Sequence, residues 1–256
     1  MPEGDSIAGD AVRLRPILVG KKIEAVGGTA GAIRSNSHRI LDAEVTSVRT
    51  RGKNLLIDLS GGYSVRVHLG MTGRWREGVI PRARLSLTTG SGSVSCLDAP
   101  TVDVDRTAAI DRALDRLGPD LLDDFDEDDF IRRARAVDPM PVGRLLLDQR
   151  VVAGVGNVYK SELLFLAGIN PWTSTADVTD HQLREISRNA RELLAFNVGR
   201  RRSTTGSTGR GQETWVYGQR GHRCRRCGTT IEMASLDDRV TFWCPSCQQL
   251  GASPGM

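Results

Sequence analysis

The chain has 256 residues, of which 39% are hydrophobic and 26% are charged, and its formal net charge is +4. This length suits two domains, or one domain with an appendage, and the apolar content is high enough to form a core and to exclude wholesale disorder. The chain contains no run of about eighteen apolar residues and no basic-then-apolar leader. We therefore expect a soluble, cytoplasmic protein that does not bind a membrane.

The first hundred residues predict a helix followed by short strands. Asp5 or Ser6 can cap the helix, because each offers a side-chain acceptor to the first free amides. An apolar stripe then follows at helical spacing up to Gly20, formed by Ile7, Ala11, Leu14 and Leu18. Apolar and alternating runs predict strands at 23–26, 44–49, 54–59, 63–69, 84–88 and 93–97. Strands at this regular spacing indicate an antiparallel β-sandwich with the helix packed alongside.

Charge is distributed unevenly along the chain. Residues 98–129 contain twelve acidic residues and three arginines, and Ile110, Leu114 and Leu117 predict a helix there that stops at Gly118-Pro119. Residues 199–226 contain eight arginines and one acidic residue. A charge run is usually a solvated face, but a cationic block beside a metal-ligand pattern favours nucleic-acid binding.

The second half is helical in period, with helices predicted at 129–137, 141–147, 157–166 and 181–196. The glycine-rich turn 154–157 begins the third of these helices. Backbone amides at such a helix start form an anion site, although the same turn also serves as a tight connection. It lacks the lysine of a phosphate-binding loop and does not follow a strand, so we expect no nucleotide cofactor.

Four of the five cysteines form two Cys-x2-Cys pairs separated by sixteen residues: Cys224, Cys227, Cys244 and Cys247. Each pair presents two thiolates from one tight turn, and two such turns complete a tetrahedron, as in a zinc ribbon. Because four protein ligands leave no position for water, we predict one structural zinc ion. The run 241–243 leads into the second pair as a strand and predicts a β-hairpin finger. Cys96, in an apolar run, is expected to be a buried thiol.

The N-terminus begins Met1-Pro2-Glu3. Initiator methionine is generally removed before proline, which leaves Pro2 with a free secondary amine beside the carboxylate of Glu3. An α-amino group titrates near pH ~7.7–8, so part of it is neutral at physiological pH. A neutral secondary amine attacks carbonyl and acetal carbons and then forms a cationic iminium. The alternative is that Met-Pro has no chemical meaning here, as in many proteins.

Lys53 lies in a predicted turn between two strands, within Arg51-Gly52-Lys53-Asn54. The chain has only four lysines against thirty-one arginines. A desolvated lysine exchanges a proton near neutrality and an arginine does not, so Lys53 is a candidate proton-transfer group. The alternative is a structural residue that is lysine by chance.

Taken in order, these elements resemble the formamidopyrimidine-DNA glycosylase / endonuclease VIII family of base-excision repair enzymes, over nearly the whole chain. The landmarks are Met1-Pro2-Glu3-Gly4, Arg51-Gly52-Lys53-Asn54-Leu55, His68-Leu69-Gly70-Met71-Thr72-Gly73, Arg116-Leu117-Gly118-Pro119-Asp120, Leu146-Leu147-Asp148-Gln149, Gly154-Val155-Gly156-Asn157, and the run from Arg239 to Cys247. Each landmark alone is weak evidence for the family, and together the landmarks are highly specific for it.

The resemblance implies an α+β multidomain fold. It has an N-terminal catalytic β-sandwich with flanking helices at 1–117, a helical DNA-binding domain with a helix–two-turn–helix motif at 118–210, and a zinc-ribbon β-hairpin at 211–256. It also implies a monomeric, bifunctional DNA glycosylase and apurinic/apyrimidinic (AP) lyase that binds damaged double-stranded DNA. Such a protein is associated with the nucleoid when bound.

The family's catalytic roles fall on four residues. By analogy, Pro2 attacks C1′ of the damaged nucleotide and displaces the base, and Glu3 acts as acid/base at the sugar ring. Lys53 assists proton transfer and holds phosphate. Arg239, from the finger, contacts the DNA backbone and supports the second elimination.

Three further residues match DNA contacts. Asn157 and Arg116 match positions that contact phosphate. Met71 is the candidate wedge that fills the space left by the flipped nucleotide, and the alternative is an ordinary core residue at the end of a strand.

The sequence leaves the substrate open. The start Gly4-Asp5-Ser6 favours endonuclease VIII and oxidised pyrimidines, whereas Leu69-Gly70-Met71 is closer to the formamidopyrimidine form. Residues 96–100 hold no counterpart of the Arg-x-Phe pair that fills the void opposite oxidised guanine. Oxidised pyrimidines are the leading class, and oxidised purines or hydantoins are the alternative. A non-catalytic zinc protein that binds damaged DNA is the rival, but it does not explain Pro2, Glu3 and Lys53 together.

Overall fold

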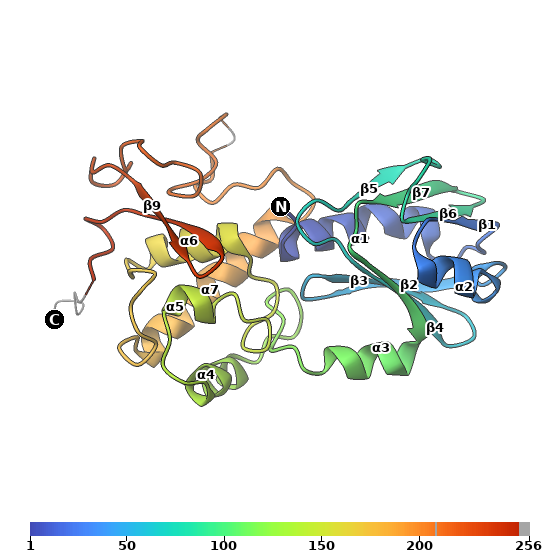
Figure 1. The fold of residues 1–256 in the computed structure, drawn as a ribbon, viewed down its shortest axis with the longest axis horizontal. Helices are drawn as coiled ribbons and strands as arrows, with labels where there is room; N and C mark the ends of the chain where they lie inside the picture. The colour runs from blue at the N-terminus through green and yellow to red at the C-terminus, as the bar shows by residue number, and fades with distance from the viewer. Residues whose placement is uncertain (208, 251–256) are drawn as a thin grey trace. The chain divides into compact units, whose positions relative to one another are not determined.

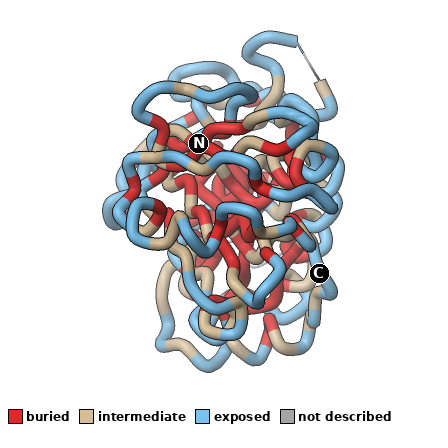
Figure 2. The backbone as a smooth tube through the Cα atoms, turned by 90° about the vertical axis from the view of Figure 1, so that its right-hand side faces the viewer, coloured by how far each residue is buried: buried red, intermediate tan, exposed pale blue. Residues whose placement is uncertain are grey.

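The computed structural model describes residues 1–207 and 209–250, and the chain divides into two compact units (Figure 1). The first unit is Met1–Arg116 and the second begins at Leu117. Each unit has its own buried core, and Figure 2 marks the buried stretches in red. The predicted division into a catalytic β-sandwich at 1–117, a helical DNA-binding domain at 118–210 and a zinc finger at 211–256 stays a prediction. Its residues 251–256 lie outside the described part.

The first unit contains two four-stranded antiparallel sheets, which confirms the predicted β-sandwich. One sheet has the order β1-β6-β7-β5, with β1 (Ala25–Gly27), β6 (Leu85–Thr89), β7 (Gly92–Leu97) and β5 (Arg74–Glu77). The other has the order β2-β3-β4-β8, with β2 (Val45–Arg51), β3 (Asn54–Leu59), β4 (Tyr63–His68) and β8 (Thr101–Arg106). Apolar side chains from both sheets join one core, including Ile57, Val65, Leu87 and Val94. Cys96 is buried there as expected, and burial raises the pKa of its thiol to about 12.

The first helix, α1 (Gly4–Leu18), packs against β2, β3 and β7. Its predicted stripe of Ile7, Ala11, Leu14 and Leu18 is buried, and each large apolar side chain contributes roughly 1.5–3 kcal/mol by burial. The predicted cap is wrong, because the N-cap residue is Glu3 rather than Asp5 or Ser6. The backbone amide of Glu3 donates to Ser6 Oγ (3.4 Å), so Ser6 caps from inside the first turn.

Sequence patterns missed three elements of the first unit and misplaced the end of a fourth. Helix α2 (Gly31–Ile40) is rich in polar residues and buries only Ile33 and Ile40. Edge strand β5 buries only Trp75, and β8 lies inside the acidic stretch, where charge masks the alternation. Helix α3 (Thr107–Leu114) ends before the predicted stop at Gly118-Pro119, so Leu117 lies beyond it.

The second unit contains four helices among its described residues, at the predicted places. They are α4 (Glu127–Ala136), α5 (Val142–Leu145), α6 (Asn157–Leu166) and α7 (Asp180–Asn197). Thr179 caps α7 through a capping box with Gln182. Every residue of α6 except the last is buried, so this helix is the centre of the unit.

The same unit ends in an antiparallel hairpin of β9 (Glu232–Leu236) and β10 (Arg239–Trp243), which confirms the predicted finger. A separate small apolar cluster in this unit includes Phe165, Val216 and Ile231. Among the described residues, no helix has the length and apolar character that a membrane crossing requires.

Candidate active site and metal centre

The first two candidate residues lie where the chain enters α1. Pro2 is half-buried, and Glu3 is fully buried with 0% of its surface exposed. The next carboxylate, Asp5, accepts hydrogen bonds from the backbone amide (2.7 Å) and hydroxyl (3.1 Å) of Ser6. The N-terminus of a helix favours negative charge, since its first amides lack partners within the helix. Glu3 is thus a buried carboxylate at the N-cap of α1, in the residue that follows Pro2.

Lys53 lies in the two-residue turn that joins β2 to β3, where Arg51 pairs with Asn54. Gly52 has a φ of 57°, a conformation that glycine adopts without strain, and Asn54 Nδ2 donates to the Arg51 carbonyl (3.0 Å). These contacts fix the turn, and the Lys53 side chain extends from it half-buried.

The sequence assigned no role to His68. Its imidazole lies close enough to Lys53 for the lysine charge to act on its pKa. Burial lowers the pKa of His68, and the positive charges of Lys53 and Arg66 lower that pKa further. His68 Nδ1 accepts a hydrogen bond from the Gly70 amide (3.2 Å). The landmark motif therefore begins at a residue whose pKa depends on the charge of Lys53.

Met71 is exposed over 62% of its surface, which contradicts its interpretation as a core residue. A tight turn presents it, in which the Gly73 amide donates to the Leu69 carbonyl (2.8 Å). A Cβ at Gly73 would lie 2.3 Å from that carbonyl oxygen, so the turn requires glycine there. Arg116, the last residue of the first unit, is also exposed.

In the second unit, Asn157 of α6 forms a direct hydrogen bond with β10, the second strand of the finger hairpin. Asn157 Nδ2 donates to the Val240 carbonyl (2.7 Å), beside Arg239, whose side chain is exposed. Asn157 Oδ1 is buried and has no hydrogen-bond partner among the described residues. The preceding turn is held by Gln149, whose side chain accepts from the Gly154 amide (3.1 Å) and donates to the Val155 carbonyl (2.9 Å). The structure therefore brings Asn157 next to the backbone of Arg239.

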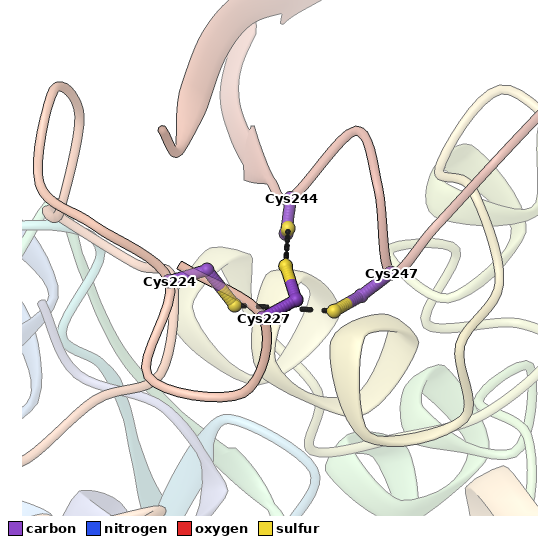
Figure 3. Close-up of side chains that lie close together, drawn as sticks. All are labelled: Cys224, Cys227, Cys244 and Cys247. Atoms are coloured by element: carbon purple, nitrogen blue, oxygen red, sulfur yellow. Dashed lines mark hydrogen bonds between the residues drawn. The ribbon is translucent and has the colours of Figure 1, made fainter. Parts of the chain in front are cut away.

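The four cysteines converge from two turns that flank the hairpin, and their sulfur atoms all lie within 4.8 Å of one another (Figure 3). The Sγ–Sγ distance is 3.9 Å for Cys224–Cys247 and 3.4 Å for Cys227–Cys244. A tetrahedron of Zn–S bonds of about 2.3 Å requires sulfur atoms about 3.8 Å apart, so the residues fit a zinc ion. Hydrogen bonds from Thr229 lower the pKa of the Cys227 thiol to about 6, whereas burial raises the pKa of the Cys244 and Cys247 thiols.

Three family models match the chain. The formamidopyrimidine-DNA glycosylase N-terminal domain matches residues 1–100, the formamidopyrimidine-DNA glycosylase H2TH domain matches 117–208, and the zinc finger found in FPG and IleRS matches 221–250. The chain belongs to the formamidopyrimidine-DNA glycosylase / endonuclease VIII family. This membership confirms the resemblance, the fold class and the structural zinc ion that Cys224, Cys227, Cys244 and Cys247 hold.

Relatives of this family member match nearly the full chain. The DNA-(apurinic or apyrimidinic site) lyase Nei2 of Mycolicibacterium smegmatis is 42% identical, over 97% of this chain and 99% of its own length. Probable endonuclease 8 2 of Streptomyces coelicolor is 38% identical, over 97% of this chain and 94% of its own. The solved structure of Lactococcus lactis Fpg (MutM) in complex with DNA that contains an oxidised pyrimidine has a TM-score of 0.84 and 27% identity, covering 97% of this chain and 100% of that chain.

Sequence reasoning also missed a buried carboxylate in α6 of this glycosylase-family chain. Glu162 accepts hydrogen bonds from the Thr204 hydroxyl and from the amides of Trp215 (2.7 Å), Val216 (2.9 Å) and Tyr217 (2.8 Å). Burial raises the pKa of Glu162, and these donors oppose that effect. The available clue was a glutamate that directly precedes the apolar run 163–166.

Proposed function

We propose that this family member removes oxidised bases from double-stranded DNA through a Schiff base on Pro2 and then cleaves the strand by elimination. It is a bifunctional DNA N-glycosylase and AP lyase of base-excision repair. The observation that carries this proposal is Glu3, a fully buried carboxylate held at the N-cap of α1 in the residue after Pro2. A fixed carboxylate beside an amine is the arrangement that proton transfer at a sugar ring requires.

The reaction begins at the nitrogen of Pro2. Removal of Met1 frees a secondary amine, part of which is neutral near pH 7. The nitrogen attacks C1′, the glycosidic bond breaks, and the base leaves with the electron pair and takes up a proton. Opening of the sugar ring gives an iminium at C1′, which makes the 2′ hydrogen acidic. Loss of that proton expels the 3′ phosphate, a second elimination expels the 5′ phosphate, and hydrolysis releases Pro2.

Three other catalytic groups support this reaction. Glu3 exchanges protons with the sugar ring oxygen, and its burial keeps water from competing for that role. Lys53 transfers a proton and holds a phosphate, and the fixed β2–β3 turn supports both tasks. Arg239 contacts the DNA backbone and supports the second elimination.

Three residues bind the duplex in this proposal. Asn157 and Arg116 contact phosphates, and Met71 fills the space that the flipped nucleotide vacates. The exposure of Met71 supports the wedge, because a side chain must be accessible to enter a base stack. Unstacking a base costs a few kcal/mol, which such a wedge helps to offset.

Oxidised pyrimidines are the substrate class that we favour, with oxidised purines or hydantoins as the alternative. The names of the two relatives, endonuclease 8 and Nei2, agree with the Gly4-Asp5-Ser6 start of this chain. We further propose that the protein acts as a monomer in the cytoplasm, on the nucleoid when bound to DNA.

The deciding experiment is trapping with a mild hydride reductant on duplexes that carry a pyrimidine lesion, a purine lesion or an abasic site. We expect a covalent adduct whose cross-linked residue is Pro2, and the lesion that reacts fastest ranks the substrates. The matched control is the same protein with Met1 retained, verified by mass spectrometry, which should bind the duplex without forming an adduct. Binding without an adduct on every duplex by the processed protein would establish the non-catalytic rival instead.

A further inference from the structure

Lys160, in the second turn of α6, is a charged residue that the proposed function does not use. It is one of four lysines in the chain, and its side chain is completely buried, with 0% exposed. An ammonium group removed from water is costly unless hydrogen bonds compensate it. The partners of Lys160 therefore indicate what the fold gains from it.

Two partners of Lys160 lie on β10, the second strand of the finger hairpin. Lys160 Nζ donates to the Thr241 hydroxyl at 2.6 Å and to the Val240 carbonyl at 3.5 Å. Because the ammonium group can only donate, the Thr241 oxygen must accept, and its own proton is available for another acceptor. That acceptor is the backbone carbonyl of Arg239, 3.3 Å from Thr241 Oγ1.

These bonds form a directed chain from helix to strand, from Lys160 Nζ to Thr241 Oγ1 and then to the Arg239 carbonyl. Hydrogen bonds that begin at a charged donor are about twice as strong as neutral ones. Asn157 adds a second bond from α6 to the Val240 carbonyl (2.7 Å). Residues 239–241 are thus held from one side by two side chains of one helix.

We propose that Lys160 is a positioning residue for Arg239. Through the Thr241 hydroxyl it fixes the backbone from which the exposed Arg239 side chain reaches the DNA. Lys160 touches no substrate, and this inference rests on the role proposed for Arg239. Its effect should appear in the second elimination and in contacts to the DNA backbone, and not in the attack by Pro2.

The test is a double-mutant cycle measured by single-turnover cleavage of abasic duplex. Lys160→Met keeps the apolar stem and removes the ammonium group, and we expect the second elimination to slow by about tenfold or more, because small displacements of a catalytic group have effects of this order. Thr241→Val breaks the chain at the hydroxyl and should have the same effect, whereas Thr241→Ser keeps the hydroxyl and should restore the rate. Lys22→Met, which removes one exposed lysine, is the matched control for charge.

The Arg239→Ala background decides the inference. If Lys160 acts through Arg239, then Lys160→Met and Thr241→Val slow the wild-type protein but add nothing to Arg239→Ala. Full additivity, or a loss that follows the zinc content or melting temperature instead, overturns the positioning role. A normal second elimination in Lys160→Met or Thr241→Val, with a loss in Arg239→Ala, also overturns it and leaves the proposed function intact. If Arg239→Ala leaves the second elimination unchanged, Arg239 has no role in that step, and this inference fails with it.

Discussion

The N-cap of α1 in the first unit and helix α6 in the second use hydrogen bonds of very different sequence range. At the N-cap the bond is local, since the Glu3 backbone amide donates to Ser6 Oγ three residues away. The charged and polar groups of α6 instead meet partners far along the chain, 42 residues away for Glu162–Thr204 and 83 for Asn157–Val240. Local contacts form with the helix itself, whereas distant contacts form only when the whole second unit folds. Loss of the N-cap bond should therefore act locally on α1, whereas loss of the Glu162 contacts should act on the folding of the whole second unit.

Removal of zinc should produce the largest effect and should stay within the second unit. In zinc-finger peptides the binding energy, about 10–16 kcal/mol, is folding energy, so chelation should unfold the hairpin and abolish DNA binding. Zinc content, duplex binding and incision are measured on the same sample, with re-added zinc as control. Zinc-free protein that still incises normally would contradict this account of the finger.

Glu162→Leu tests the long-range side of the comparison. It leaves three backbone amides and the Thr204 hydroxyl without their acceptor, and each buried donor left unpaired costs about 1–3 kcal/mol. Urea denaturation measures the loss, and hydrogen exchange should show faster exchange at 215–217 but not in α1. Glu162→Gln, which keeps an acceptor oxygen, is the matched control. Equal stability of the two variants would show that the acceptor is not what holds this segment.

Lys53→Ala tests the first unit, where a local turn holds the side chain. Because Lys53 lies in a turn whose geometry depends on Gly52 and Asn54, stability should not change. Single-turnover base removal should fall by about a hundredfold, the usual scale for a general acid or base, and duplex affinity should fall less. Lys53→Arg keeps the charge without the proton exchange and should restore affinity but not rate. Equal losses of rate and affinity in Lys53→Ala would make Lys53 a phosphate contact alone.

The smallest effect is a pH dependence at His68. Burial and the charges of Lys53 and Arg66 lower the His68 pKa in the folded protein, whereas a histidine in the unfolded chain titrates near ~6.5. The unfolded chain then binds more protons between these two values, so stability is complete above about pH 6.5 and falls as pH drops towards the folded pKa. Urea midpoints measured across this window should slope upward with pH and flatten in His68→Asn. Lys53→Ala should raise the His68 pKa observed by NMR. An unchanged pKa would show that the charge of Lys53 does not act on His68.

The same contrast explains what the sequence could predict. Local patterns predicted α1, the helix at 157–166 and the cysteine tetrahedron, because spacing alone determines their geometry. Periodicity did not predict β5 or β8, whose identity depends on strands that lie beside them. The roles of Lys160 and Glu162 depend on partners at Thr241 and Thr204, and no pattern within α6 indicates those positions. Family resemblance assigned Pro2, Glu3 and Lys53, and their roles stay predictions until trapping and substitution test them.

The burial of Lys160 has a consequence for how the protein responds to ionic strength. Seven of the eight arginines between 199 and 226 are exposed, and salt screens exposed charges over about 8 Å at physiological concentration. The hydrogen bonds of Lys160 are excluded from solvent, so the same salt barely weakens them. DNA affinity should fall steeply with salt as phosphate contacts are lost, while β10 stays in place on α6. The protein can thus leave one stretch of duplex and bind another without rebuilding the strand that carries Arg239.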